Sequence, residues 1–186
     1  IQEDLEKIVE KGGDEIIVST AMEALGTLRG KDAAWLALLA KYAEKPKIEV
    51  KNAALRLLGK SGDAGSVPVL AKALDDPNWS TRMAALNGLE ALRTAEAVGA
   101  IIARMEHENG LMAQRFADTL FRLTGRPYRM AAAAWKSWWE TSSASFKPIS
   151  VAELSKLKEE EEKRVLKQSS HVATFFGVRI LSRRVI

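Results

Sequence analysis

The sequence predicts an all-α protein, an α-solenoid of about four helical hairpins stacked side by side. The main observation is a phrase of small and apolar residues that recurs four times, at steps of 33, 31 and 32 residues. Its markers are four alanines and the large apolar residues that follow each of them after four positions: Ala21, Ala54, Ala85 and Ala117, then Leu25, Leu58, Leu89 and Phe121. A fixed period of this length is typical of stacked repeats, in which each unit buries its apolar face against the next.

Each repeat is expected to contain two helices, a marker helix and a companion helix. The marker helix of the second repeat has apolar residues at i, i+3, i+4, i+7 and i+8, which is one face of an α-helix: Val50, Ala53, Ala54, Leu57 and Leu58. A loop with three glycines (residues 59–65) follows, and then the companion helix (residues 67–74). Asp76 is predicted to cap the next marker helix, with Pro77 in its first turn. Residues 1–11 are interpreted as the remaining helix of an earlier repeat.

The fourth repeat ends in a helix rich in tryptophan. Trp135, Trp138 and Trp139 are spaced i, i+3 and i+4, so they share one helical face. We expect them to form a terminal cap, because the last repeat has no following neighbour to cover its apolar surface. The alternative is an aromatic pocket for a ligand, a peptide or stacked bases. The solenoid with this cap is assigned residues 1–143.

The remaining sequence differs in composition from the repeats. Residues 144–170 are predicted to be a linker and a charged spacer helix that ends at Lys167, with Ser150 and Glu153 as a capping box. Residues 171–186 are rich in β-branched and aromatic residues, which predicts a short strand-forming tail. An unpaired apolar strand tends to find another strand or surface. We therefore expect the tail to pack on the repeats or to pair with another copy of the chain.

Composition excludes several classes of site and partner. The net charge is +4, but eight basic and five acidic residues in 151–186 account for +3 of it, so the repeats are nearly neutral. They lack the broad basic face that nucleic-acid binding requires, which makes a nucleic-acid partner an unfavoured interpretation. The chain has no cysteine, which excludes disulfides and thiolate metal sites. No apolar run approaches the ~20 residues that a membrane-spanning helix needs.

The residue patterns give no catalytic, cofactor-binding or metal-binding candidate. His107 and His171 each lack a neighbouring histidine or cysteine at metal-ligand spacing. Asp75 and Asp76 belong to a turn between repeats, where aspartate is expected for capping. The prediction is therefore a protein that is not an enzyme and that carries no cofactor.

Two resemblances add to this interpretation. The marker phrases and paired helices of residues 14–143 resemble the HEAT family, specifically its short, alanine-rich units. The stretch Phe176–Gly177 to Ile180, followed by Ser182 to Ile186, resembles the start of a von Willebrand factor type A domain. The sequence ends before that family's Asp-x-Ser-x-Ser motif, so no metal ligand is carried over. Together the resemblances imply a non-catalytic interaction scaffold within a larger multidomain protein, whose partner is another protein or a neighbouring domain of the same polypeptide.

The resemblance to HEAT repeats leaves further alternatives open. Some HEAT-like solenoids hold duplex DNA and excise alkylated bases, and others act as bilin lyases. The candidates for contact with a nucleic acid would be Trp79, Arg82, Arg104 and Arg115. The candidates for contact with a protein on the concave side of the solenoid are Lys72, Arg104 and Lys136.

Overall fold

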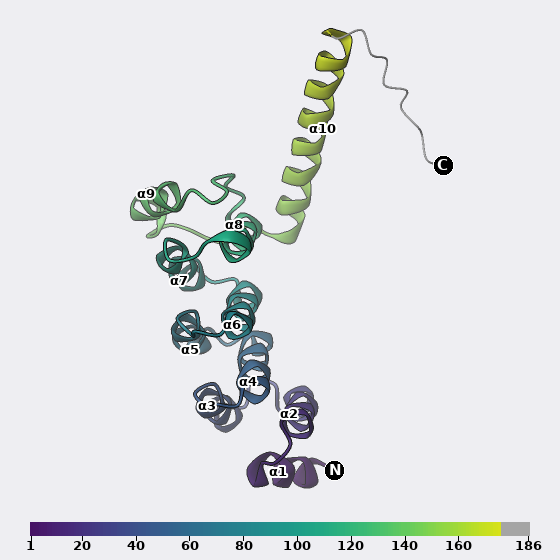
Figure 1. Ribbon diagram of the computed structural model, residues 1–186, viewed down its shortest axis with the longest axis vertical. Helices are drawn as coiled ribbons and strands as arrows, with labels where there is room; N and C mark the ends of the chain where they lie inside the picture. The colour runs from purple at the N-terminus through teal and green to yellow at the C-terminus, as the bar shows by residue number, and fades with distance from the viewer. Residues whose placement is uncertain (176–186) are drawn as a thin grey trace, which may run out of the picture. The chain divides into compact units, whose positions relative to one another are not determined.

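The computed structural model describes residues 1–175, and the side chains of these residues except 161 and 167–175. Every regular element in this range is helical, which confirms the all-α prediction (Figure 1). The chain divides into two compact units, Ile1–Pro148 and Ile149–Ile186.

The first unit is a stack of helical hairpins in two rows. One row contains the marker helices: α2 (Glu15–Arg29), α4 (Ile48–Ser61), α6 (Trp79–Leu92) and α8 (Gly110–Thr124). The other row contains the companion helices: α3 (Ala33–Tyr42), α5 (Val67–Ala73, after a 3₁₀ turn at Ala64–Ser66), α7 (Ala95–Met105) and α9 (Ala132–Ser142). In Figure 1 the two rows run side by side along this unit. Helix α1 (Gln2–Lys11) begins 31 residues before α3, which is the repeat distance, and thus corresponds to a companion helix.

Short polar side chains start several of these helices. The Asp14 carboxylate accepts hydrogen bonds from the backbone N–H groups of Ile16 and Ile17, at 2.9 and 3.2 Å. At α6 the cap is Asn78, whose side-chain oxygen accepts from Ser80 N at 2.9 Å. The assignment of Asp76 as this cap was wrong by two residues, and Pro77 lies before the helix. Asp76 instead accepts from Asn78 N at 2.8 Å, so it fixes the turn that leads into the cap.

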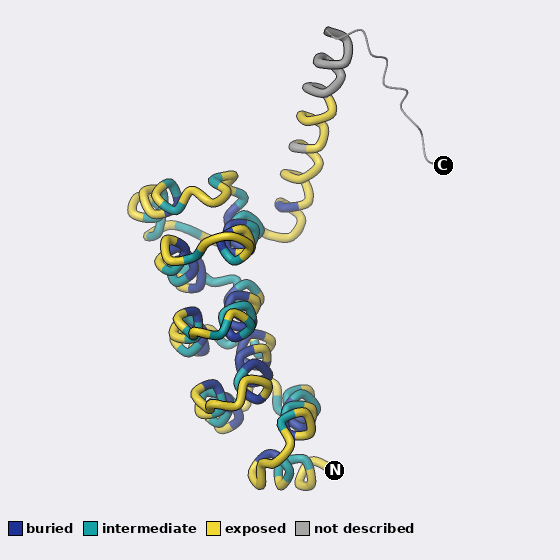
Figure 2. Tube along the Cα trace, viewed as in Figure 1, coloured by how far each residue is buried: buried dark blue, intermediate teal, exposed yellow. Residues whose placement is uncertain are grey.

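The core lies where the two rows face each other and between successive marker helices (Figure 2). The four marker alanines are between 0 and 3% exposed. Leu25, Leu58 and Leu89 are at most 1% exposed, whereas Phe121 is only half-buried. The residue next to it, Leu120, is 0% exposed.

Neighbouring marker helices meet through a constant set of positions. The residues four before, one before and three after the marker alanine are buried in each of the last three marker helices: Val50, Ala53 and Leu57 in α4; Thr81, Ala84 and Gly88 in α6; Ala113, Phe116 and Leu120 in α8. This face contacts the preceding marker helix, since a Cβ on Gly26 of α2 would lie 2.4 Å from Leu57 Cδ2. Likewise Gly59 of α4 lies against Gly88 of α6.

We predict that Gly59→Ala destabilises the protein and that Gly26→Ala does not. Both glycines lie five residues after a marker alanine, inside a helix where alanine is intrinsically favoured by about 1 kcal/mol. A Cβ on Gly59 would lie 2.4 Å from the backbone Cα of Gly88, so two helices must move apart. We expect a net loss of about 1–3 kcal/mol in the free energy of unfolding for Gly59→Ala, measured by urea denaturation.

Gly26→Ala is the matched control. The atom that its Cβ would meet is the terminal methyl group of Leu57, which can rotate away, so we expect a change within about 1 kcal/mol. Equal losses for the two variants would contradict the close crossing of α4 and α6.

The second unit contains helix α10 (Val151–Phe175). Its start confirms the capping box: Ser150 Oγ accepts from Glu153 N at 3.2 Å, and the Glu153 carboxylate accepts from Ser150 N at 2.7 Å. The helix continues eight residues beyond Lys167, so residues 171–175, predicted as part of the strand-forming tail, are helical. Extending an existing helix costs far less than starting one, and this outweighs the β-propensity of these residues. The rest of that tail, including the stretch that resembles a type A domain, lies outside the described residues.

Candidate functional site

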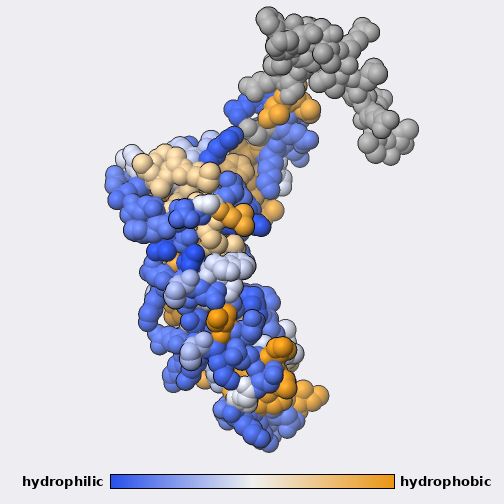
Figure 3. Space-filling model, in the orientation of Figure 1, coloured by the Kyte–Doolittle hydropathy of each residue, from blue (hydrophilic) through white to orange (hydrophobic). Residues whose placement is uncertain are grey.

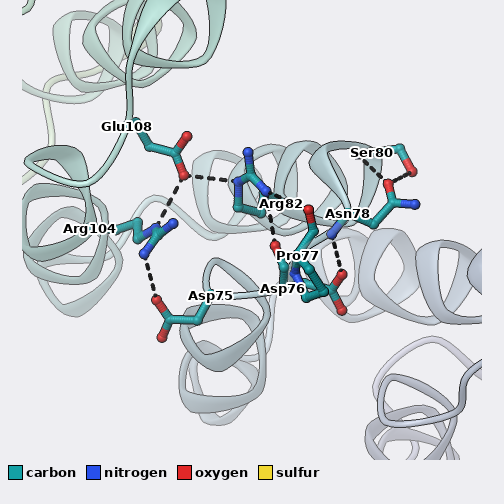
Figure 4. A network of polar contacts seen from close by, with 8 residues as sticks. All are labelled: Asp75, Asp76, Pro77, Asn78, Ser80, Arg82, Arg104 and Glu108. Atoms are coloured by element: carbon teal, nitrogen blue, oxygen red, sulfur yellow. Dashed lines mark hydrogen bonds and ion pairs between the residues drawn. The ribbon is translucent and has the colours of Figure 1, made fainter.

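The most extensive polar cluster joins α5, α6, α7 and the turns between them (Figure 4). At its centre is the Glu108 carboxylate, whose side chain is 4% exposed. Glu108 Oε1 lies 2.9 Å from Arg82 Nε and 3.1 Å from Arg104 Nε. Arg104 Nη1 reaches Asp75 Oδ1 at 3.1 Å, and Arg82 Nη1 donates to the carbonyl oxygens of Asp76 and Pro77. The cluster thus ties the second and third hairpins together.

A further ion pair extends this cluster toward α4. Lys51 Nζ lies 2.7 Å from Asp76 Oδ2, and both side chains are less than 20% exposed. Burial acts to raise the pKa of the Asp76 carboxyl. Two hydrogen bonds, from Lys51 and from Asn78 N, and the positive charges of Lys51 and Arg82 act to lower this pKa. Their combined effect is larger than that of burial, so the pKa lies below its ordinary value of 3.8. The ionised form of Asp76 is therefore the form that the fold stabilises.

We predict that Asp76→Asn lowers the free energy of unfolding at neutral pH by about 1.5–3 kcal/mol, because it removes a charge-assisted hydrogen bond. A carboxyl with a lowered folded pKa stabilises above its unfolded pKa, and this stabilisation is lost as the pH falls through the folded value. The loss should therefore be full at pH 7 and shrink as the pH drops below 3.8. Urea denaturation of both proteins between pH 7 and pH 2 measures this. A difference that is constant with pH would contradict the ion pair.

The basic residues of the companion helices follow the repeat period and face acidic residues of the preceding repeat. Lys72 Nζ of α5 lies 2.7 Å from Glu44 Oε1, and Arg104 of α7 is held by Asp75. Lys136 of α9 lines a groove together with Glu106. Lys72, Arg104 and Lys136 are the residues that the sequence offered as contacts for a protein partner. Two of the three are engaged in ion pairs within the stack.

The candidate residues for nucleic-acid contact are not brought together as a basic face. Arg82 and Arg104 bind the buried Glu108 carboxylate. Trp79, the first residue of α6, and Arg115, in the second turn of α8, are both exposed. A phosphate would have to compete with a desolvated carboxylate for both arginines of the cluster, which is costly.

Exposed apolar side chains recur along one edge of the marker row. Ile48, Trp79 and Leu111 each lie six residues before a marker alanine, in the first turn of α4, α6 and α8. They are 38, 64 and 73% exposed. The space-filling view shows separate apolar spots on a largely hydrophilic surface (Figure 3). Sequence reasoning followed the buried positions of the repeat and missed this edge, although the same period would have revealed it.

A groove separates the companion helices α3 and α5. Its volume is about 760 Å³. Small apolar residues form part of its wall, and charged residues surround them: Ala40, Ala43, Pro68, Val69 and Ala73, then Lys41, Glu44, Lys51, Lys72, Asp75 and Asp76. Ion pairs already join several of these charges, with Lys51 bound to Asp76 and Lys72 to Glu44. The groove has no convergent set of unpaired polar groups of the kind that orients a small ligand.

Aromatic side chains cluster around α9. Trp135 is 0% exposed and donates from Nε1 to the carbonyl oxygen of Arg129 at 2.8 Å. It belongs to the same continuous core as Phe116 of α8. Trp138 and Trp139 are half-buried, and each packs edge-on against Phe146, with ring centroids 5.3 and 5.4 Å apart. Trp138 contacts both Trp135 and Trp139, with ring centroids 6.0 and 5.6 Å apart, and this packing supports the proposal of a terminal cap. Trp139 also borders the groove that Lys136 and Glu106 line.

Within the part of the chain that the structure describes, no group of three or more histidine, cysteine, aspartate or glutamate side chains is arranged to hold a metal ion. No helix in the same range is both long and apolar enough to cross a membrane.

Comparison with known proteins bears on the architecture alone. No curated protein matches the sequence. A family model described as HEAT repeats matches residues 2–76 and again residues 36–120. The two matches overlap and together extend over more than half of the chain, across the first three marker helices and most of the fourth. HEAT repeats typically mediate protein–protein interaction and are generally non-catalytic. By this match and by its two rows of stacked helices, the chain belongs to the HEAT-repeat family.

Proposed function

We propose that this chain is a non-catalytic scaffold that binds another protein, or a neighbouring domain of the same polypeptide, along the edge defined by Ile48, Trp79 and Leu111. The observation that carries the proposal is the recurrence of exposed apolar side chains at the repeat period. Burial of these side chains in a complex would be favourable, since their exposed area costs free energy in water.

The spacing of the edge residues favours a protein partner. Successive helices in a stack lie about 8–10 Å apart, so the three side chains form a regular series. A partner with apolar residues at matching intervals could contact all three. Trp79 is the best candidate for an anchor, because tryptophan is enriched among the residues that dominate binding energy in interfaces.

The charged residues of the stack support this choice of surface. Lys72 and Arg104 have carboxylate partners within the stack, and a protein ligand would have to displace Glu44 or Asp75 to reach them. The apolar edge needs no such exchange. Binding there leaves the inter-repeat ion pairs intact.

Site-specific photo-cross-linking in cells tests the proposal. A photoreactive amino acid replaces Trp79 in one variant and Leu111 in another. The control carries it at Ala91, which is also exposed but lies near the opposite end of α6. We expect both edge variants to capture the same protein or the same domain, identified by mass spectrometry of the linked peptides, and the control to capture it rarely.

A second change tests whether the edge acts as one surface. Ile48→Ser should reduce cross-linking from position 111, although residue 48 is two repeats away. If positions 79 and 111 captured unrelated peptides, or no more than position 91 does, the edge would not be the binding surface.

A further inference from the structure

Ion pairs bridge successive companion helices at a position that repeats along the stack. Each candidate pair joins a basic residue of a companion helix to an acidic residue in the turn after the preceding companion helix: Lys72 and Glu44, Arg104 and Asp75, Lys136 and Glu106. The first two pairs are formed. Lys72 Nζ lies 2.7 Å from Glu44 Oε1, and Arg104 Nη1 lies 3.1 Å from Asp75 Oδ1.

The third pair is not formed, although Lys136 and Glu106 border the same groove between α7 and α9. Glu106 Oε1 lies 3.7 Å from His107 Nε2 of its own turn. In the part of the chain that the structure describes, Lys136 forms no ion pair, and neither does Glu140, which also borders the groove. The charged groups that close the two preceding interfaces are thus available to a ligand at this one.

The groove between α7 and α9 has an aromatic wall and small residues around it. Its volume is about 300 Å³. Trp139 lies directly over Gly99, since a Cβ at position 99 would be 3.1 Å from Trp139 Nε1. Ala103 and Ala132 border the groove on the two helices. The volume is at the lower limit for small-molecule pockets, about 300–1,000 Å³, and thus suits a single long side chain.

The charges that border the groove favour a cationic occupant. Glu106 and Glu140 contribute two carboxylates and Lys136 contributes one ammonium group, so the sum is negative. Both carboxylates are exposed and can be reached from solvent. Trp139 adds an aromatic ring, and the faces of aromatic rings attract cations. A cation in this groove would therefore meet two carboxylates and an indole ring.

We propose that the groove between α7 and α9 binds an arginine side chain of a partner protein. The guanidinium group is planar, binds carboxylates through two parallel hydrogen bonds, stacks on aromatic rings and is less strongly hydrated than an ammonium group. It would bind Glu106 and Glu140 and lie against Trp139. Lys136 has a flexible four-carbon stem and can turn away from the incoming cation.

Solution NMR of the isotopically labelled full chain tests the proposal, with N-acetyl-arginine amide as the probe. The indole N–H signal of Trp139, assigned by comparison with Trp139→Phe, reports on the groove. We expect this signal to shift and to saturate with a dissociation constant in the millimolar range, because one side chain supplies few contacts.

Two matched probes separate charge from shape. N-acetyl-citrulline amide has nearly the shape of the arginine probe but is neutral, and it should bind at least ~10-fold more weakly. N-acetyl-lysine amide has the same charge but lacks the planar group, and it should bind at least ~3-fold more weakly.

Substitutions locate the bound cation. Glu106→Gln and Glu140→Gln should each raise the dissociation constant of the arginine probe about 5-fold, because each removes a charge-assisted hydrogen bond. Lys136→Met should lower it about 3-fold, since a like charge is removed. Ala103→Leu should abolish binding by filling the groove. Glu49→Gln is the control, because Glu49 is also exposed but lies on α4, outside the groove.

Several outcomes would overturn the proposal. A Trp139 signal that does not move, or that moves equally with the arginine and citrulline probes, excludes recognition of a cation. Equal affinity for the lysine probe excludes a site for guanidinium. An affinity that neither glutamine variant changes places the probe outside the groove. None of these results affects the edge defined by Ile48, Trp79 and Leu111, whose own test is the cross-linking experiment.

Discussion

Replacement of Glu108 with alanine is expected to lower the free energy of unfolding by about 3–5 kcal/mol, since it removes one partner of a buried ion-pair cluster. Arg82 and Arg104 would both lose their carboxylate at Nε, and their side chains are only 16 and 22% exposed. Arg104 would retain Asp75 at 3.1 Å, but that carboxylate is 72% exposed and binds weakly. Urea denaturation at neutral pH measures the loss.

The control for this prediction is Glu106→Ala. Glu106 lies two residues away in the same turn, but its side chain is 52% exposed and its described contact is with the exposed His107. We expect a change within about 0.5 kcal/mol, as for most surface substitutions. Glu108→Gln keeps the shape and removes the charge. If Glu108→Gln and Glu108→Ala were both as mild as Glu106→Ala, the cluster would contribute little to joining the hairpins.

Trp135→Ala is expected to destabilise the protein by about 3–5 kcal/mol, because it leaves a large cavity in the core between α8 and α9. Trp135 is fully buried and contacts Tyr128 and Trp138 edge-on, with ring centroids 5.0 and 6.0 Å apart. Its Nε1 also donates to the carbonyl oxygen of Arg129, which would be left without this donor. Thermal and urea denaturation followed by circular dichroism measure the effect.

Trp79→Ala provides a matched comparison with the same side chain removed from the surface. Trp79 is 64% exposed, so we expect a change within about 0.5 kcal/mol in stability. The same variant should weaken capture of a partner at the apolar edge. A stability loss at Trp79 as large as that at Trp135 would show that Trp79 belongs to the core and would remove the anchor of the proposed binding surface.

The fold could be predicted from the sequence because the same pattern of small and apolar residues occurs in each of the four repeats. One marker alanine is a weak signal, but four alanines at nearly constant spacing, each with apolar residues at helical intervals, agree with one another. The capping box at Ser150 was also legible, because it depends on residues only three positions apart. Signals of this kind are local or periodic, and a single sequence contains them in full.

The sequence-based predictions were wrong where the outcome depends on the structural surroundings of a residue and not on its local pattern. Asp76 resembles a helix cap in sequence, yet Lys51, which lies 25 positions earlier, binds its carboxylate, and Asn78 caps the helix. The helical state of residues 171–175 reflects their continuity with α10, which outweighs the preference of β-branched residues for strands. Phe121 has the spacing of a core residue but is only half-buried.

The sequence by itself determined the helical hairpins, their period and the positions that face the core, because these follow from local propensity and from apolar spacing. Only the tertiary structure decided which charges are available to a partner. Arg82 and Arg104 look like surface cations in the sequence, and the fold directs both to Glu108. It also decided that Trp79 is exposed and Trp135 is buried, since whether an apolar residue is covered depends on the element that packs against it and not on the residue itself.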